Sequence, residues 1–143
     1  MRRGFTLIET ISALTVGAIL LGVVARPAQG LLERTRAARA AQLVASDLES
    51  ARATAQRRHR AVRVVFDSSA MRYSIVDRGT GLVVRSRSIG TSSDVKLRGA
   101  SFAPATLEIY PGGMTSSSLT VTLSAGAVSR RVTMSRSGMV RSP

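Results

Sequence analysis

The chain has 143 residues, with 21 basic and eight acidic side chains, and its formal net charge at pH 7 is +13. It contains no cysteine, which excludes disulfide bonds and thiolate metal ligands, and only three phenylalanines and two tyrosines, so its core must be mainly aliphatic. A chain of this length has room for one small domain built on a helix.

The N-terminal segment joins a basic leader to a long apolar run. Residues 2–4 read Arg-Arg-Gly, and residues 5–25 carry a single charge, Glu9. About 20 apolar residues in a helix span the hydrocarbon of a membrane, and a carboxylate inside that layer needs a partner. Cleavage between Gly4 and Phe5 would place a new α-amino group one helical turn from Glu9. We therefore expect a membrane-spanning helix over residues 5–25, with Glu9 paired to its own terminus or to that of a neighbouring subunit.

The sequence Arg-Arg-Gly-Phe-Thr-Leu-Ile-Glu at positions 2–9, followed by an apolar helix, resembles the N-terminal signal of type IV prepilins and type II secretion pseudopilins. The resemblance implies that a prepilin peptidase removes residues 1–4 by cleaving after Gly4. It also implies that the new N-terminal residue, Phe5, is N-methylated and that Glu9 aligns an incoming subunit with the filament. An ordinary secretory signal fits poorly, because its shorter apolar core should end at a small-residue cleavage site. An uncleaved signal anchor is the alternative.

The charges beside the apolar run predict its orientation. Arg2 and Arg3 precede the run, and the positive-inside bias keeps such residues in the cytoplasm. Arg26, directly after the run, argues mildly for the reverse, but the leader comes first and the resemblance implies the same topology. We expect a single-pass inner-membrane protein with a cytoplasmic N-terminus and a periplasmic C-terminal domain.

An amphipathic helix is expected over residues 26–60. Pro27 should kink or pause the helix near its start. Beyond it, six apolar residues recur at spacings of three and four and form one face: Ala37, Ala41, Val44, Leu48, Ala51 and Ala55. Charged residues are expected on the other faces: Arg34, Arg36, Arg39, Asp47, Glu49 and Arg52. A coiled-coil seam would also show such a stripe, but this one is short and mostly alanine, so we expect it to lie against a sheet.

From residue 61 the apolar period changes to two, which predicts strands. The expected strands lie at 61–66, 71–76, 82–89, 95–97, 106–110, 119–124, 128–134 and 139–141, the first three as an antiparallel meander. The predicted fold class is α+β. A long N-terminal helix, membrane-spanning in its first half and amphipathic in its second, packs on a β-rich antiparallel domain over residues 61–143.

The rest of the chain resembles the GspH/FimT group. Residues 43–66 are similar to that group's passage from helix to strand, and residues 130–141 to its terminal strand, turn and strand. Major pilins differ in carrying a cysteine pair. The resemblance implies a minor pseudopilin or pilin-like structural subunit, at or near the tip of a type II secretion pseudopilus or a type IV pilus. Its implied partners are other pilins or pseudopilins, the prepilin peptidase and the inner membrane.

Arginines gather in two clusters. The first, near the end of the helix, contains Arg52, Arg57, Arg58, His59, Arg60 and Arg63, and the second contains Arg130, Arg131, Arg136 and Arg141. Guanidinium groups suit phosphates, acidic partner subunits and anionic lipids alike. Some members of the group bind DNA through C-terminal basic residues during natural transformation, so a DNA-binding minor pilin for DNA uptake is the alternative function. No aromatic residue is interleaved in the second cluster, so stacking of single-stranded bases is unsupported.

The sequence offers little for catalysis. His59 is the only histidine and lies in a basic run, where a solvated helix-end residue is expected rather than a general base. No pair of acids or histidine has the spacing of metal ligands, and the glycine-rich stretches 79–81 and 111–113 lack the lysine of a phosphate-binding loop. We expect a subunit that is not an enzyme and needs no cofactor.

Overall fold

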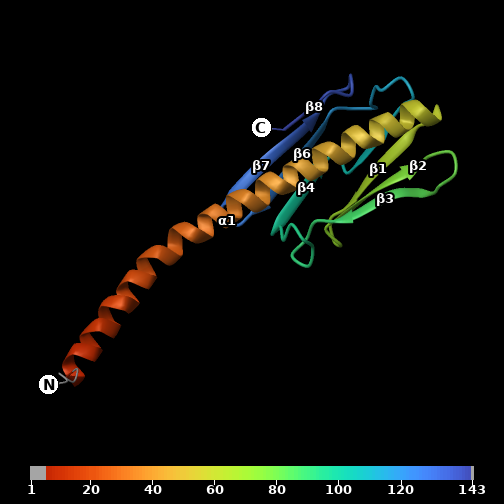
Figure 1. Cartoon of the computed structure of the whole chain (residues 1–143). Helices are drawn as coiled ribbons and strands as arrows, with labels where there is room; N and C mark the ends of the chain where they lie inside the picture. The colour runs from red at the N-terminus through yellow and green to blue at the C-terminus, as the bar shows by residue number, and fades with distance from the viewer. Residues whose placement is uncertain (1–5, 143) are drawn as a thin grey trace. The chain divides into compact units, whose positions relative to one another are not determined.

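One long helix precedes the strands in the computed structural model, which describes residues 6–142 without the side chains of residues 23–28 (Figure 1). The elements are α1 (Leu7–Arg58), β1 (Val62–Asp67), β2 (Arg72–Asp77), β3 (Val83–Ser88), β4 (Gly99–Ala103), β5 (Thr106–Ile109), β6 (Leu119–Ala125), β7 (Val128–Met134) and β8 (Val140–Arg141). The chain divides into two compact units, Met1–Leu32 and Glu33–Pro143, which are described separately. This order, in which one helix precedes a set of antiparallel strands, is the predicted α+β fold.

α1 runs through Pro27 without a break, so the expected pause is wrong. Proline removes one backbone hydrogen bond, but its fixed φ is already close to the helical value. The neighbours on both sides can therefore keep helical dihedral angles.

The C-terminal end of α1 is closed by a residue in the left-handed region. His59 has a φ of 50°, and the N–H of Arg60 donates to the carbonyl of Ala55 at 3.3 Å. This arrangement satisfies carbonyls that the helix end would otherwise leave unpaired. Arg57 and Arg58 in the last turn also interact favourably with the negative end of the helix dipole. The only histidine of the chain is thus an exposed helix-end residue, as expected.

The strands of the second unit form two four-stranded antiparallel sheets (Figure 1). Sheet A has the order β3-β2-β1-β5 and contains the predicted meander of the first three strands. Sheet B has the order β4-β6-β7-β8. Because β4 belongs to sheet B and β5 to sheet A, the chain changes sheet twice between β3 and β5 and once more before β6. The two sheets are therefore interleaved in sequence.

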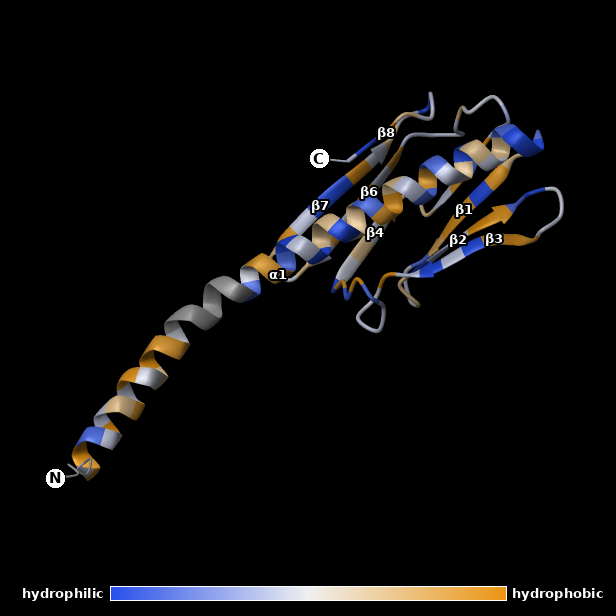
Figure 2. Cartoon of the chain, in the orientation of Figure 1, coloured by the Kyte–Doolittle hydropathy of each residue, from blue (hydrophilic) through white to orange (hydrophobic). Residues whose placement is uncertain are grey.

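The core of the second unit lies between the apolar face of α1 and the two sheets. All six residues of the predicted helical stripe are buried, each at most 2% exposed. Phe66 of β1 and Phe102 of β4 stack with ring centroids 4.2 Å apart, which joins sheet A to sheet B. Figure 2 colours β1 and β2 as mostly hydrophobic and the last turn of α1 as hydrophilic. The burial confirms that this stripe faces sheets.

No strand forms at residues 95–97, so that prediction is wrong. Val95 and Leu97 are buried, but Lys96 between them has a φ of 50°, which an extended strand does not allow. The segment is a loop that places two apolar side chains in the core. The next strand begins at Gly99 instead.

Candidate functional site

In the first unit, α1 presents apolar side chains to its surroundings at positions all round the helix. Ten large apolar residues are each at least 54% exposed: Leu7, Ile8, Ile11, Leu14, Val16, Ile19, Leu20, Leu21, Leu31 and Leu32. Their numbers do not follow a single helical stripe, and a helix that is apolar all round belongs inside a membrane or a protein assembly. Among the described residues, however, no helix combines the length and the mean hydropathy of a membrane-crossing segment.

The polar groups of this segment are mostly satisfied within the helix. The hydroxyls of Thr10, Ser12 and Thr15 each donate to the carbonyl four residues earlier, at 2.7–3.2 Å. Glu9 is exposed in the first turn and carries the one charge of residues 6–22. The predicted cleavage and methylation positions, Gly4 and Phe5, lie outside the described residues.

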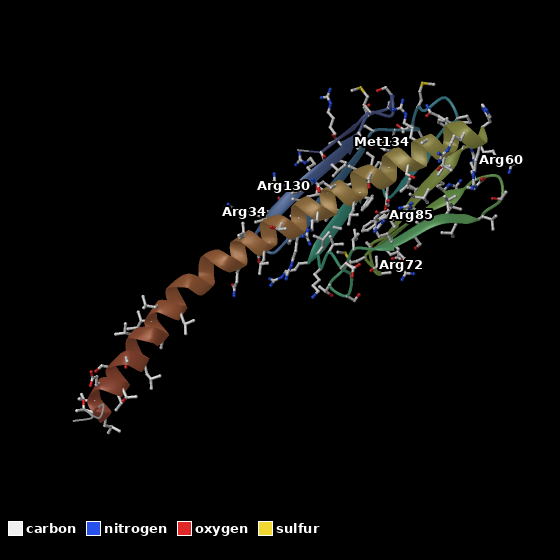
Figure 3. The ribbon with its side chains drawn as sticks, viewed as in Figure 1. Arg34, Arg60, Arg72, Arg85, Arg130 and Met134 are labelled. Carbon is white, nitrogen blue, oxygen red and sulfur yellow. The ribbon has the colours of Figure 1, made fainter. Side chains whose placement is uncertain are left out.

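Asp47 is buried in α1, which corrects the expectation that it lies on an exposed face. The residue is 2% exposed, and its carboxylate accepts three hydrogen bonds. The Tyr73 hydroxyl donates at 2.5 Å, Arg85 Nη1 at 2.8 Å and Arg87 Nε at 2.8 Å, so the carboxylate binds α1 to β2 and β3. Arg85 is labelled in Figure 3 where it reaches from β3 toward α1.

The Asp47 cluster, defined as Asp47 with Tyr73, Arg85 and Arg87, shifts the ionisation of its members. Burial, followed by the hydrogen bond to Asp47, raises the pKa of Tyr73. The hydrogen bond to Asp47 likewise raises the pKa of Arg87. The sequence did contain a signal for this burial, because Asp47 follows Val44 by three residues and precedes Ala51 by four, as a member of the apolar stripe would.

Carboxylates of sheet A form ion pairs with two arginines of the first cluster and with the neighbouring Arg78. Arg63 and Arg78 contact Glu108 at 2.9 and 3.3 Å, and Arg58 contacts Asp77 at 3.5 Å. The Asp77 carboxylate also accepts hydrogen bonds from the backbone of the turn between β2 and β3. Part of this cluster is therefore already paired within the domain itself.

The four arginines of the second cluster do not share one surface. Because successive residues of a strand point to opposite faces, Arg130 lies on the core side of β7 with Val132, and Arg131 lies on the outer side. Arg130 and Met134 are labelled on β7 in Figure 3. Arg130 Nε is buried and has no hydrogen-bond partner in the described structure.

Arg131 and Arg141 do come together on the outer side. Arg141 of β8 pairs with Thr133 of β7, two residues beyond Arg131, and these three residues line a shallow depression of about 410 Å³ with Ser142. Arg136 lies in the turn between the strands, where its carbonyl accepts a hydrogen bond from the backbone of Thr115 at 2.9 Å. In the described structure, no carboxylate forms an ion pair with any of the four arginines.

The described side chains do not meet the requirements of a metal site. No group of three histidine, aspartate or glutamate side chains among them is placed to hold a metal ion. A second depression, of about 480 Å³, lies over β6, β7 and β8. Its lining consists of serine and threonine hydroxyls with Leu119, Met134, Met139 and Arg141, and it includes no histidine or carboxylate. These surfaces offer positive charge for binding.

Comparison with known proteins identifies similar families and folds. The family model described as "Type II transport protein GspH" matches residues 40–138, and the "Prokaryotic N-terminal methylation motif" matches residues 1–25. Two solved structures share the fold. The type IV minor pilin FimU of Pseudomonas aeruginosa is 20% identical with a TM-score of 0.63, over 79% of this chain and 92% of that one. The minor pseudopilin EpsH of the Type 2 Secretion System of Vibrio cholerae is 17% identical with a TM-score of 0.59, over 76% and 96%. No curated protein sequence matches the chain significantly.

Proposed function

Because the chain belongs to the GspH family of type II transport proteins, it is a minor pseudopilin or pilin subunit, and we propose that it is added at or near the tip of a type II secretion pseudopilus or a type IV pilus. The family and the fold are those of structural subunits that assemble with other pilins. Support for the filament role also comes from the methylation motif at residues 1–25.

The exposed apolar helix of the first unit is the observation that carries this proposal. Ten large apolar side chains of this unit must be covered, and the second unit already has a closed core of its own. A membrane before assembly, and neighbouring helices afterwards, supply that cover. Glu9 then pairs with the N-terminal amine of an adjacent subunit, since an unpaired carboxylate in an apolar environment is costly.

Processing and location follow as parts of the same proposal. The prepilin peptidase cleaves after Gly4, and Phe5 becomes the methylated N-terminus. Arg2 and Arg3 keep the leader in the cytoplasm, and the second unit lies in the periplasm. The alternative, a DNA-binding minor pilin for DNA uptake, is less well supported, because Arg130 lies on the opposite side of β7 from Arg131.

Replacement of Glu9 tests the filament role. The chain has no cysteine, so one cysteine introduced in α1 is a unique attachment site for a reagent that crosslinks the subunit to its filament neighbours. We expect Glu9→Leu to insert into the membrane but to crosslink about tenfold less than the wild type, because the pair with the neighbouring amine is lost. Glu49→Leu, which removes an exposed acid from the same helix, should crosslink normally. Normal crosslinking of Glu9→Leu would contradict the proposed role.

Processing is tested separately by mass. The mature chain should begin at a methylated Phe5, and Gly4→Val should keep the leader, because its branched side chain should not fit the peptidase. Mass spectrometry of filament-associated protein measures both. An intact leader on the wild-type subunit in filaments would overturn this part of the proposal.

A further inference from the structure

The outer edge of β7 is only partly covered. On one side β6 pairs with all of β7, from Val128 to Met134, but on the other side β8 pairs only with Thr133 and Met134. Among the described residues, no other strand or backbone hydrogen bond reaches this outer edge at residues 128–132. Unpaired N–H and C=O groups on a strand edge accept an added strand readily.

Two adjacent arginines lie on this open edge, and no described carboxylate forms an ion pair with either of them. Arg130 points to the core side with its Nε buried and unpartnered, and Arg131 points to the outer side, where it shares the 410 Å³ depression with Arg141. The sequence contains no aspartate or glutamate after Glu108. Both arginines are therefore available to carboxylates of a partner molecule.

We propose that the open edge of β7 receives an extended acidic segment of a neighbouring pilin or pseudopilin subunit, which adds to sheet B as a strand in line with β8. The identity of this partner rests on the proposed function. Two adjacent acidic residues of the segment point to opposite faces, one toward Arg130 and the other toward Arg131 and Arg141. Main-chain hydrogen bonds supply affinity, and the two charge-assisted pairs fix the register.

The open edge of sheet A shows why an acidic segment fits sheet B in particular. β3 is also an edge strand, and its first residues, Val83 and Val84, are exposed. Its arginines, however, are already bound to Asp47. An acidic strand added at that edge would therefore find no unpaired arginine on β3. Duplex DNA fits the β7 edge less well than a strand does, because a phosphate backbone meets arginines on one face and these two point to opposite faces.

Peptide binding to the full-length chain in detergent micelles tests the inference. The probe is a fluorescent peptide of alternating threonine and valine with two adjacent glutamates at its centre, and fluorescence anisotropy measures its affinity. We expect Arg131→Ala with Arg141→Ala to weaken binding about tenfold or more. Both residues are exposed, so the fold should survive. The matched control, Arg39→Ala with Arg57→Ala, removes the same charge from exposed positions of α1 and should weaken binding less than about twofold.

Two further probes separate strand addition from simple charge attraction. A peptide with glutamine in place of both glutamates should bind about tenfold less tightly. A peptide N-methylated at alternate amides keeps both carboxylates but loses main-chain donors, and it should not bind. Equal losses from the two double variants, or full binding of the N-methylated peptide, would overturn the inference. So would duplex DNA that binds through Arg131 and Arg141 where the peptide does not.

Failure of this inference differs from failure of the proposed function. A wild-type chain that crosslinks normally in filaments but does not bind the acidic peptide contradicts only the strand addition. A chain that binds the peptide but never enters a filament contradicts the proposed function and leaves the peptide site without its assigned partner.

Discussion

Sheets A and B hold their arginines in opposite electrostatic conditions. Four arginines of sheet A and its turns contact a carboxylate of the same chain within 3.3 Å: Arg63, Arg78, Arg85 and Arg87. The four of sheet B and its turn contact none in the described structure. The arginines of sheet A are therefore paired within the domain, whereas those of sheet B are available to bind a partner. Three changes test this division.

The largest effect is expected from Asp47→Ala. The change leaves the buried Tyr73 hydroxyl without its acceptor and both arginine partners without a counter-charge, at a cost of about 3 kcal/mol in the free energy of unfolding. Arg85 and Arg87 are partly exposed, which keeps the cost below that of a fully buried pair. Urea denaturation measures the difference.

Glu49→Ala is the matched control for Asp47→Ala. Glu49 is an exposed acid two residues later in the same helix, so its removal changes the net charge equally. We expect a change below about 0.5 kcal/mol. Equal destabilisation by the two variants would show that net charge, rather than the Asp47 cluster, accounts for the loss.

Acid should destabilise the domain mainly through the turns of sheet A. Burial alone would raise the pKa of Asp77, but hydrogen bonds from the backbone of Gly79 and Thr80, and the nearby Arg60, lower it. A hydrogen bond from the Ser69 hydroxyl similarly lowers the pKa of Asp67. A carboxylate with a lowered folded pKa stabilises the fold above its unfolded pKa of 3.8, and that stabilisation is lost as the pH falls through the folded value.

We therefore expect the free energy of unfolding to fall between about pH 5 and pH 2, and Asp77→Asn to show a shallower fall. Urea titrations at a series of pH values measure this slope. If Asp77→Asn leaves the dependence of the free energy of unfolding on pH unchanged, the acid sensitivity comes from other groups.

The smallest effect on stability is expected from the arginines of sheet B. Arg131→Ala with Arg141→Ala should change the free energy of unfolding by less than about 0.5 kcal/mol, because both side chains are exposed and neither forms an ion pair with a described carboxylate. Thermal unfolding checks this directly. A loss above about 1 kcal/mol would mean that these arginines hold the fold, and the division between the sheets would fail.

Local periodicity was enough to predict most elements of the fold. The helical stripe from Ala37 to Ala55 is set by spacings within one helix, and the strands by alternation within each segment, so both are readable without tertiary contacts. Residues 95–97 show the limit, because a short apolar alternation also suits a loop that buries two side chains around a left-handed residue.

The sites depended more on distant parts of the chain. Asp47 finds its partners 26 to 40 residues away, so only its position within the stripe hinted at burial. The arginines of the second cluster lie close together in sequence, but the period of two in β7 places Arg130 and Arg131 on opposite faces. The partly uncovered edge of β7 could not be predicted, since it depends on how far β8 extends.

The hydroxyls of Thr10, Ser12 and Thr15 have a consequence for the transfer of α1 from one solvent to another. Each hydroxyl stays bonded to its own helix, so its enthalpy changes little between lipid, detergent and a packed protein interior. In the described part of this segment, Glu9 is the one group whose free energy depends strongly on the medium. Under the proposed function, Glu9 is the described residue expected to affect most the partition of this segment between a bilayer and a filament.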